Sequence, residues 1–161
     1  MIKYKLFLDL DGVLADFDAG VLASCGKLPG ELMPRVMWPI LARTKDFYAK
    51  LPWMKDGKEL WERCKPFDPV ILTGIPLGQW AAPQKLSWCA KELGARIPVI
   101  TCLSKEKGSA ISNWLEEDET PILVDDRLKS QPSWLDIGGI FVLHSSAEDS
   151  LKQLNTWFPG I

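Results

Sequence analysis

The sequence has no long apolar run: among its 161 residues no uninterrupted hydrophobic stretch approaches the roughly 20 residues that cross a bilayer. It also has no basic stripe, because no cluster of Lys or Arg stands out and the formal net charge is −2. Since polymeric nucleic acids require clustered positive charge, we expect neither a membrane nor a nucleic acid polymer as partner. A small phosphorylated molecule needs only a few local cations and remains a possible ligand.

Cysteine pairs are also absent. Four cysteines are scattered along the chain without the CxxC spacing of zinc or redox sites: Cys25, Cys64, Cys89 and Cys102. The first residues show no signal-peptide pattern, since Met1 to Lys5 leads directly into a short apolar run that ends in acidic residues. We therefore expect reduced cysteines in a cytoplasmic protein. His144 is the only histidine, and a structural or solvent-facing role is expected for it.

The composition, with 47% hydrophobic and 25% charged residues, is ordinary for a globular protein. Its length favours a single domain over residues 1–161. Five short apolar runs predict buried strands: Tyr4–Asp9, Pro69–Thr73, Ile97–Thr101, Pro121–Asp125 and Gly139–Leu143. Helical periodicity appears over Pro83–Leu93, Lys107–Glu117 and Ala147–Phe158. This alternation predicts an α/β fold with a Rossmann-like parallel sheet in three layers, and ligands bind such sheets beyond the carboxyl ends of the strands.

The stretch from about residue 16 to residue 58 breaks this rhythm. It is rich in Met, Trp and Pro and contains no clear strand, only the short helical pieces Glu31–Leu41 and Thr44–Lys50. Its place directly after the first strand predicts a small helical cap inserted in the domain. Its aromatic residues either form the core of the cap or contact a ligand, and both interpretations stay open.

The first strand ends in two carboxylates, Asp9 and Asp11, followed by Gly12. Two like charges held this close are unfavourable unless a divalent cation or a reacting phosphate offsets them. A carboxylate at such an edge can attack phosphorus as a nucleophile. A second carboxylate two residues on can protonate the leaving oxygen and then activate water. Gly12 allows the chain to turn sharply there.

Three further strand ends carry polar groups that a phosphate-transfer site needs. They are Thr73-Gly74, the loop Ser104-Lys105-Glu106-Lys107, and Asp125-Asp126-Arg127. Mg²⁺ suits an oxygen-only site of this kind. Taken alone, Asp125-Asp126 could be a solvated loop, and Arg127 could bind phosphate or pair with a nearby acid. Asp16 could contact a ligand or cap a helix.

Together these segments resemble motifs one to four of the haloacid dehalogenase superfamily of phosphotransferases: Asp9-Leu-Asp11-Gly12-Val13, Thr73, a loop lysine and Asp125-Asp126. A closer likeness is to the 5′(3′)-deoxyribonucleotidase family. It is carried by residues 11–17, Phe47-Tyr48, Ile71-Leu72-Thr73, Lys85-Leu-Ser-Trp88, Lys107 and Val124-Asp125-Asp126-Arg127. One departure is Thr73-Gly74-Ile75-Pro76, where the family usually has Thr-Ser-Pro, so that one hydroxyl near the phosphate is missing.

The resemblance implies Mg²⁺-dependent hydrolysis of a small phosphomonoester through an aspartyl-phosphate, with a nucleoside monophosphate as the first substrate to try. Phosphatase action on another metabolite such as a sugar phosphate, or silent binding of a phosphorylated ligand, are the alternatives. The resemblance implies that Asp9 is the nucleophile and a metal ligand, and that Asp11 is the general acid/base with its carbonyl on the metal. It implies further that Asp126 binds the metal with Asp125 assisting, and that Lys107, or else Lys105, is the neutralising lysine. Thr73 and the Gly74 amide would then bind the phosphoryl group, with Phe47 and Tyr48 at the nucleoside.

Overall fold

The computed structural model describes residues 1–161 and contains one five-stranded sheet. Its strands are β1 (Lys3–Leu8), β2 (Val70–Gly74), β3 (Val99–Cys102), β4 (Glu119–Asp125) and β5 (Ile140–Leu143). They lie in the order β3-β2-β1-β4-β5, and every neighbouring pair is parallel. The predicted α/β fold with a parallel Rossmann-like sheet is confirmed, and each predicted strand is present with its bounds shifted by no more than two residues.

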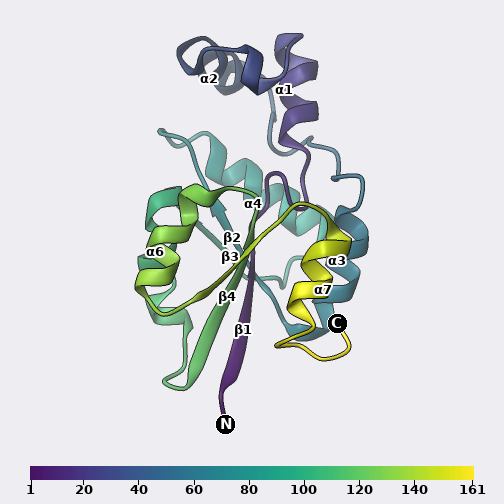
Figure 1. Ribbon diagram of the computed structural model, residues 1–161. Helices are drawn as coiled ribbons and strands as arrows, with labels where there is room; N and C mark the ends of the chain where they lie inside the picture. Colours follow the sequence, from purple (N-terminus) through teal and green to yellow (C-terminus); the bar gives the residue numbers. More distant parts are fainter.

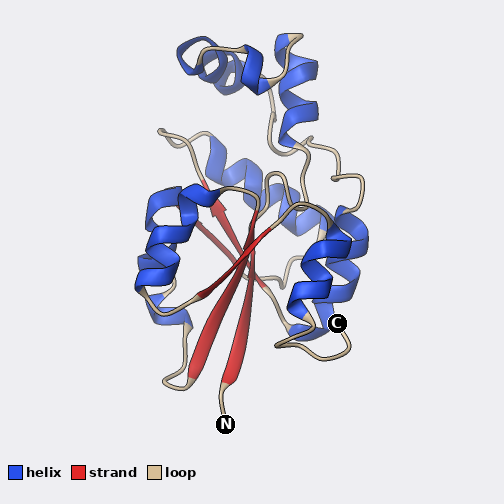
Figure 2. Ribbon diagram, in the orientation of Figure 1, coloured by secondary structure: helices blue, strands red, loops and turns tan.

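Helices lie on both sides of the sheet (Figure 2). They are α1 (Phe17–Cys25), α2 (Pro34–Arg43), α3 (Gly57–Cys64), α4 (Ala81–Glu92), α5 (Lys107–Ala110), α6 (Gln131–Asp136) and α7 (Ala147–Leu154). Short 3-10 turns cover Pro29–Glu31, Lys65–Phe67, Ser104–Glu106, Ser112–Trp114 and Leu128–Ser130. None of the helices has both the length and the apolar character needed to cross a membrane.

Alternation along the strands divides the core into two layers. Side chains of successive strand residues point to opposite faces of a sheet. Leu6 and Leu8 therefore belong to one cluster, which includes side chains of α3, α4 and α7, whereas Phe7 belongs to a second cluster. In that second layer the Phe7 ring meets the ring of Trp134 on α6 at a centroid distance of 5.3 Å. Figure 1 shows α6 on one side of the sheet and α3 with α7 on the other.

Two predicted helices are shorter than expected. Instead of Lys107–Glu117, α5 ends at Ala110 and a 3-10 turn follows. Gly, Ser and Asn recur through this stretch, and these residues favour the helix less than Ala or Leu does. Instead of Ala147–Phe158, α7 ends at Leu154. The predicted helical piece Thr44–Lys50 is wrong: these residues form turns, and Asp46 has a positive φ of 54°, which a right-handed helix does not accommodate.

The chain between β1 and α3 leaves the sheet and returns beside its point of departure. The Asp16 N–H donates to the Pro52 carbonyl at 2.8 Å, and the Met54 N–H donates to the Leu14 carbonyl at 2.7 Å. Between these contacts, α1 and α2 stand beyond the carboxyl ends of the strands (Figure 1). The Asp16 carboxylate caps α1 by accepting from the Ala19 N–H at 3.0 Å. The next helix, α3, packs against α7 beside the sheet.

Candidate active site

The carboxyl ends of β1, β2 and β4 bring the sequence-predicted polar groups to one edge of the sheet. Asp9 directly follows β1, Gly74 ends β2, and Asp125 ends β4. The Asp9 N–H donates to the Val124 carbonyl at 2.9 Å, so that the first acidic residue is held to the neighbouring strand. Parallel pairing of β1 with both β2 and β4 is what places these ends side by side.

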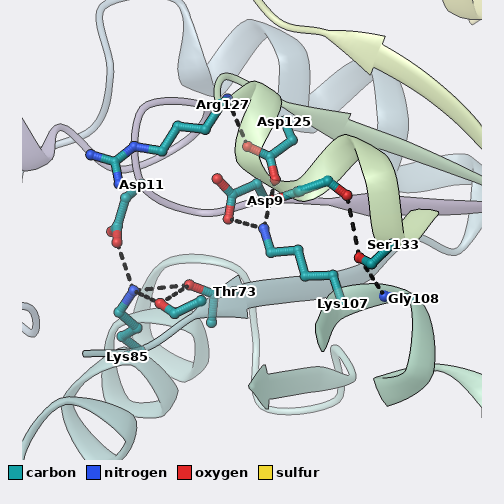
Figure 3. Close-up of polar contacts among 11 residues, drawn as sticks. Asp9, Asp11, Thr73, Lys85, Lys107, Gly108, Asp125, Arg127 and Ser133 are labelled. Atoms are coloured by element: carbon teal, nitrogen blue, oxygen red, sulfur yellow. Dashed lines mark hydrogen bonds and ion pairs between the residues drawn. The ribbon is translucent and has the colours of Figure 1, made fainter. Parts of the chain in front are cut away.

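Lys107 lies between two of the carboxylates. Its Nζ donates to Asp9 Oδ1 at 2.9 Å and to Asp125 Oδ2 at 2.7 Å (Figure 3). All three side chains are buried. Burial alone would lower the pKa of Lys107, but the charges of Asp9 and Asp125 outweigh it and raise that pKa above its usual range. Lys107 is therefore a fixed cation inside the site.

The acidic cluster is nevertheless short of positive charge. Burial raises the pKa of Asp9 to about 8; Lys107 opposes this change, and the charges of Asp125, Asp11 and Asp126 add to it. Burial, with the charge of Asp125, likewise raises the pKa of Asp126 to about 6. Carboxylates with raised pKa values favour a bound cation, because a cation restores the ionised form.

The same carboxylates have the arrangement and chemistry of a metal site. One oxygen from each of Asp9, Asp125 and Asp126 lies within 4.8 Å of the others. Asp126 Oδ1 is buried and has no hydrogen-bond partner within the protein, so that it is free to coordinate. Gly12 adopts a positive φ of 80°, and a Cβ there would collide with the Asp126 carboxylate. An all-oxygen donor set of this kind fits Mg²⁺.

A second buried lysine, Lys85 on α4, contacts Asp11. Its Nζ donates to Asp11 Oδ2 at 2.6 Å, to Thr73 Oγ1 at 3.0 Å and to the Gly74 carbonyl at 2.7 Å (Figure 3). The Tyr48 ring covers this ammonium at 4.4 Å. Sequence reasoning assigned no role to Lys85. The available signal was its place on the buried face of a predicted helix, three and four residues before Trp88 and Cys89, where an unpaired lysine is unfavourable.

A cavity of about 820 Å³ opens above these groups. Its lining contains Asp9, Asp11, Lys107, Asp125 and Asp126, together with aromatic and basic side chains. The aromatic residues form a row of neighbouring rings in the order Trp38, Phe17, Tyr48 and Trp80. This row joins the segment between β1 and α3 to the start of α4. The basic residues are Lys105, Arg127 and Lys129. The cavity thus combines a charged floor with an aromatic wall.

The other sequence-predicted residues divide between this cavity and the interior. Gly12, Gly74, Tyr48 and Lys105 line the cavity. Thr73 and Phe47 do not, since Thr73 is fully buried below Lys85 and Phe47 packs against Phe17 at a centroid distance of 5.7 Å. Of the two candidate lysines, only Lys107 contacts the carboxylates through an ion pair.

Residues outside the predicted set also have defined places. Arg127 donates its backbone N–H to Asp125 Oδ1 at 2.9 Å, which orients that carboxylate. His144 is buried, its Nδ1 lies 2.7 Å from Ser150 Oγ, and burial lowers its pKa. A structural role for His144 follows, because its hydrogen bond joins the end of β5 to α7.

No protein-family model matches the sequence, and no curated protein matches it either. Solved structures match by shape. A hydrolase from Streptococcus pneumoniae TIGR4 superposes with a TM-score of 0.61 at 13% identity, covering 96% of this chain and 100% of that one. A protein described as a haloacid dehalogenase-like hydrolase from Burkholderia xenovorans LB400 gives a TM-score of 0.53 at 13% identity, covering 88% of this chain and 81% of that one. The chain therefore has the α/β fold found in haloacid dehalogenase-like hydrolases.

Proposed function

We propose that the protein hydrolyses small phosphomonoesters in two steps, through a phosphoryl group carried on Asp9. The observation that carries the proposal is the buried arrangement of Asp9, Lys107 and Asp125 at the floor of the cavity, with Asp11 two residues from Asp9. A phosphoryl-transfer site needs a nucleophile, a proton donor and positive charge around the phosphate. These residues supply all three.

In the first step, a carboxylate oxygen of Asp9 attacks phosphorus. The new bond is an acyl-phosphate, and the bond from phosphorus to the ester oxygen breaks. Asp11 gives a proton to that leaving oxygen. In the second step Asp11 takes a proton from water, the water oxygen attacks phosphorus, and the acyl-phosphate bond breaks to return the Asp9 carboxylate with inorganic phosphate.

Two lysines assist these residues from fixed positions. Lys107 neutralises Asp9 and faces the phosphoryl group from the edge of the sheet. Lys85 holds the Asp11 carboxylate from α4. Asp11 Oδ1 has no hydrogen-bond partner within the protein, so that it remains available for proton transfer.

Asp9, Asp125 and Asp126 are the side chains that would hold Mg²⁺, with the Asp11 carbonyl as a further ligand. Bound Mg²⁺ would offset the negative charge of the phosphoryl oxygens.

The proposed substrate is a nucleoside monophosphate. Support comes from the aromatic wall of Trp38, Phe17, Tyr48 and Trp80, because a planar base can stack on such rings. The likeness to the 5′(3′)-deoxyribonucleotidase family points the same way. A sugar phosphate is the second candidate, since Asp16, Asp18 and Lys129 in the lining could bind hydroxyl groups.

The test is phosphate release from a panel of phosphomonoesters by the wild-type protein, by Asp9→Asn, and by the wild-type protein with EDTA. The panel contains 5′- and 3′-nucleotides in ribo and deoxy forms and several sugar phosphates. We expect release that needs Mg²⁺ and is lost in Asp9→Asn, with nucleotides preferred. Preference for sugar phosphates would replace the substrate and keep the chemistry. Wild-type rates in Asp9→Asn would refute the proposed mechanism, and absence of release with retained phosphate binding would favour a silent binding protein.

A further inference from the structure

Ser104 occupies the space that a side chain at position 74 would need. Gly74 pairs with Cys102 across β2 and β3, and the Ile75 N–H donates to the Cys102 carbonyl at 2.9 Å. This register brings Ser104, two residues beyond Cys102, against Gly74. A Cβ built at Gly74 would collide with Ser104 Oγ and would lie 3.2 Å from Ser104 Cβ. Gly74 is therefore the residue that admits the Ser104 hydroxyl.

The hydroxyl expected to bind phosphate, that of Thr73, is engaged elsewhere. Thr73 is fully buried. Its Oγ1 accepts from Lys85 Nζ at 3.0 Å and donates to the Gly74 carbonyl at 3.5 Å. A threonine hydroxyl has one proton to donate, and the acceptor that the structure offers it here is the Gly74 carbonyl. Thr73 is also absent from the cavity lining, which does contain Gly74 and Ser104.

We propose that Ser104, rather than Thr73, donates the side-chain hydrogen bond to the phosphoryl group in this protein. The inference rests on the proposed function, because it takes the phosphoryl group to lie at the cavity floor beside Lys107. Ser104 lines that cavity, is partly exposed, and lies on the loop that leads into Lys107.

This assignment accounts for the departure at Thr73-Gly74-Ile75-Pro76. A serine at position 74 would place a hydroxyl beside the end of β2, and the glycine there removes it. Ser104 brings a hydroxyl into the same space from the end of the neighbouring strand. The hydroxyl that is missing at position 74 is therefore replaced by the hydroxyl of Ser104, and the small glycine makes the space that this replacement needs.

The direct test measures binding of inorganic phosphate by calorimetry in the presence of Mg²⁺, so that no substrate has to be known. We expect Ser104→Ala to weaken phosphate binding roughly 10-fold or more, because a hydrogen bond to a charged group is lost. Ser104→Thr keeps a hydroxyl and should bind within about threefold of the wild-type protein. Ser109→Ala is the matched control, since Ser109 is an exposed serine on α5 outside the cavity lining.

A hydroxyl exchange separates phosphate binding from a structural role of Ser104. Gly74→Ser alone should bind phosphate poorly, because its side chain collides with Ser104 Oγ. The double variant Gly74→Ser/Ser104→Gly removes the collision and restores one hydroxyl. It should bind phosphate more tightly than either single variant, which a purely structural role would not produce.

Equal phosphate affinity in the wild-type protein and Ser104→Ala would overturn the inference and leave the proposed phosphatase chemistry intact. Absence of phosphate binding by the wild-type protein would also overturn it. Failure of the phosphatase proposal is seen separately, as equal turnover by the wild-type protein and Asp9→Asn.

Discussion

A lysine as deeply buried as Lys85, at 1% exposure, is unfavourable unless its ammonium is paired. Lys85 is paired three times, and each partner belongs to the candidate site: Asp11, Thr73 and Gly74. Ion pairs of this kind are weak evidence for stability, because the loss of hydration offsets much of the attraction. The contact with Asp11 therefore indicates a functional reason for the lysine.

Lys85→Met tests this role, since methionine keeps much of the aliphatic volume and removes the charge. Without Lys85 the Asp11 carboxylate loses its orientation, and we expect kcat/KM, which reports the first step, to fall roughly 10- to 100-fold for alkyl phosphates. Aryl phosphates should lose less, because their leaving oxygen needs little protonation. Steady-state kinetics with both substrate types give the loss for alkyl phosphates relative to the loss for aryl phosphates.

The control for this variant is Lys91→Met, which removes an exposed lysine from the same helix. Asp11 is 23% exposed in its side chain, so that water can solvate it when Lys85 is absent. The Gly74 carbonyl and the Thr73 hydroxyl also lose a donor, which lowers stability, so the rates are compared well below the melting temperature of the variant. An equal loss of kcat/KM for alkyl and aryl phosphates would contradict the positioning of Asp11 by Lys85.

At the scale of elements, α4 holds the chain segment that returns from α2 to the sheet. Gln84 Oε1 accepts from the Tyr48 N–H at 2.8 Å, Trp88 Nε1 donates to the Leu51 carbonyl at 2.8 Å, and Glu92 Oε2 accepts from Trp53 Nε1 at 2.8 Å. These three residues of α4 are four apart, so that they share one helix face. The segment that carries Tyr48, one ring of the aromatic wall, is thereby fixed to α4.

Trp88→Phe removes one of these hydrogen bonds and keeps an aromatic ring in place. Because the Leu51 carbonyl then lacks its donor in a buried setting, we expect the free energy of unfolding to fall by about 1–3 kcal/mol. Urea denaturation measures the change. Trp114→Phe, at a 42% exposed tryptophan, is the control and should leave the unfolding free energy nearly unchanged. A loss no larger than in this control would mean that the bond to Leu51 contributes nothing.

The elements that sequence reasoning predicted well are those with strong periodic signals. All five strands are apolar runs that end in turns or charges, and α4 has a clear apolar face. The helices α1, α3 and α6 were not predicted. In α6 the short length gives too few turns for a periodic pattern, and α1 is almost uniformly apolar apart from Asp18, so that no single face stands out.

The site was predictable where chemistry sits at a strand end and less so where it depends on register. Asp9 and Asp125 stand directly at the ends of apolar runs, Asp11 follows two residues after Asp9, and Lys107 lies close after β3. The contacts of Lys85 and Ser104 arise from packing between elements distant in sequence, which no local pattern contains. The burial of Thr73 and Phe47 away from the cavity has the same origin.

On the scale of the whole molecule, four acidic side chains gather at one end of the sheet around two buried lysines. Burial of these carboxylates and the repulsion among Asp9, Asp125 and Asp126 oppose folding, and both raise the pKa values of Asp9 and Asp126. A cation bound there stabilises the folded protein by mass action.

We therefore expect Mg²⁺ to raise the melting temperature. At a concentration about 100 times the dissociation constant the stabilisation is about 2.7 kcal/mol. Asp126→Asn should itself be no less stable without metal, because one repelling charge is gone, and should gain less from Mg²⁺. Thermal melts with Mg²⁺ and with EDTA measure both effects. An equal Mg²⁺ response in Asp126→Asn would exclude Asp126 as a ligand.

The measurement that tests the central claim most directly is the detection of a phosphoryl group on Asp9. Asp11→Asn is incubated with Mg²⁺ and an aryl phosphate, whose leaving group departs without a proton, and the reaction is quenched with acid. The second step lacks its base in this variant, so that the acyl-phosphate should accumulate and mass spectrometry should find one phosphoryl group on the peptide that contains Asp9. Release of the aryl alcohol with no phosphoryl group on that peptide, or undiminished release by Asp9→Asn, would contradict the account.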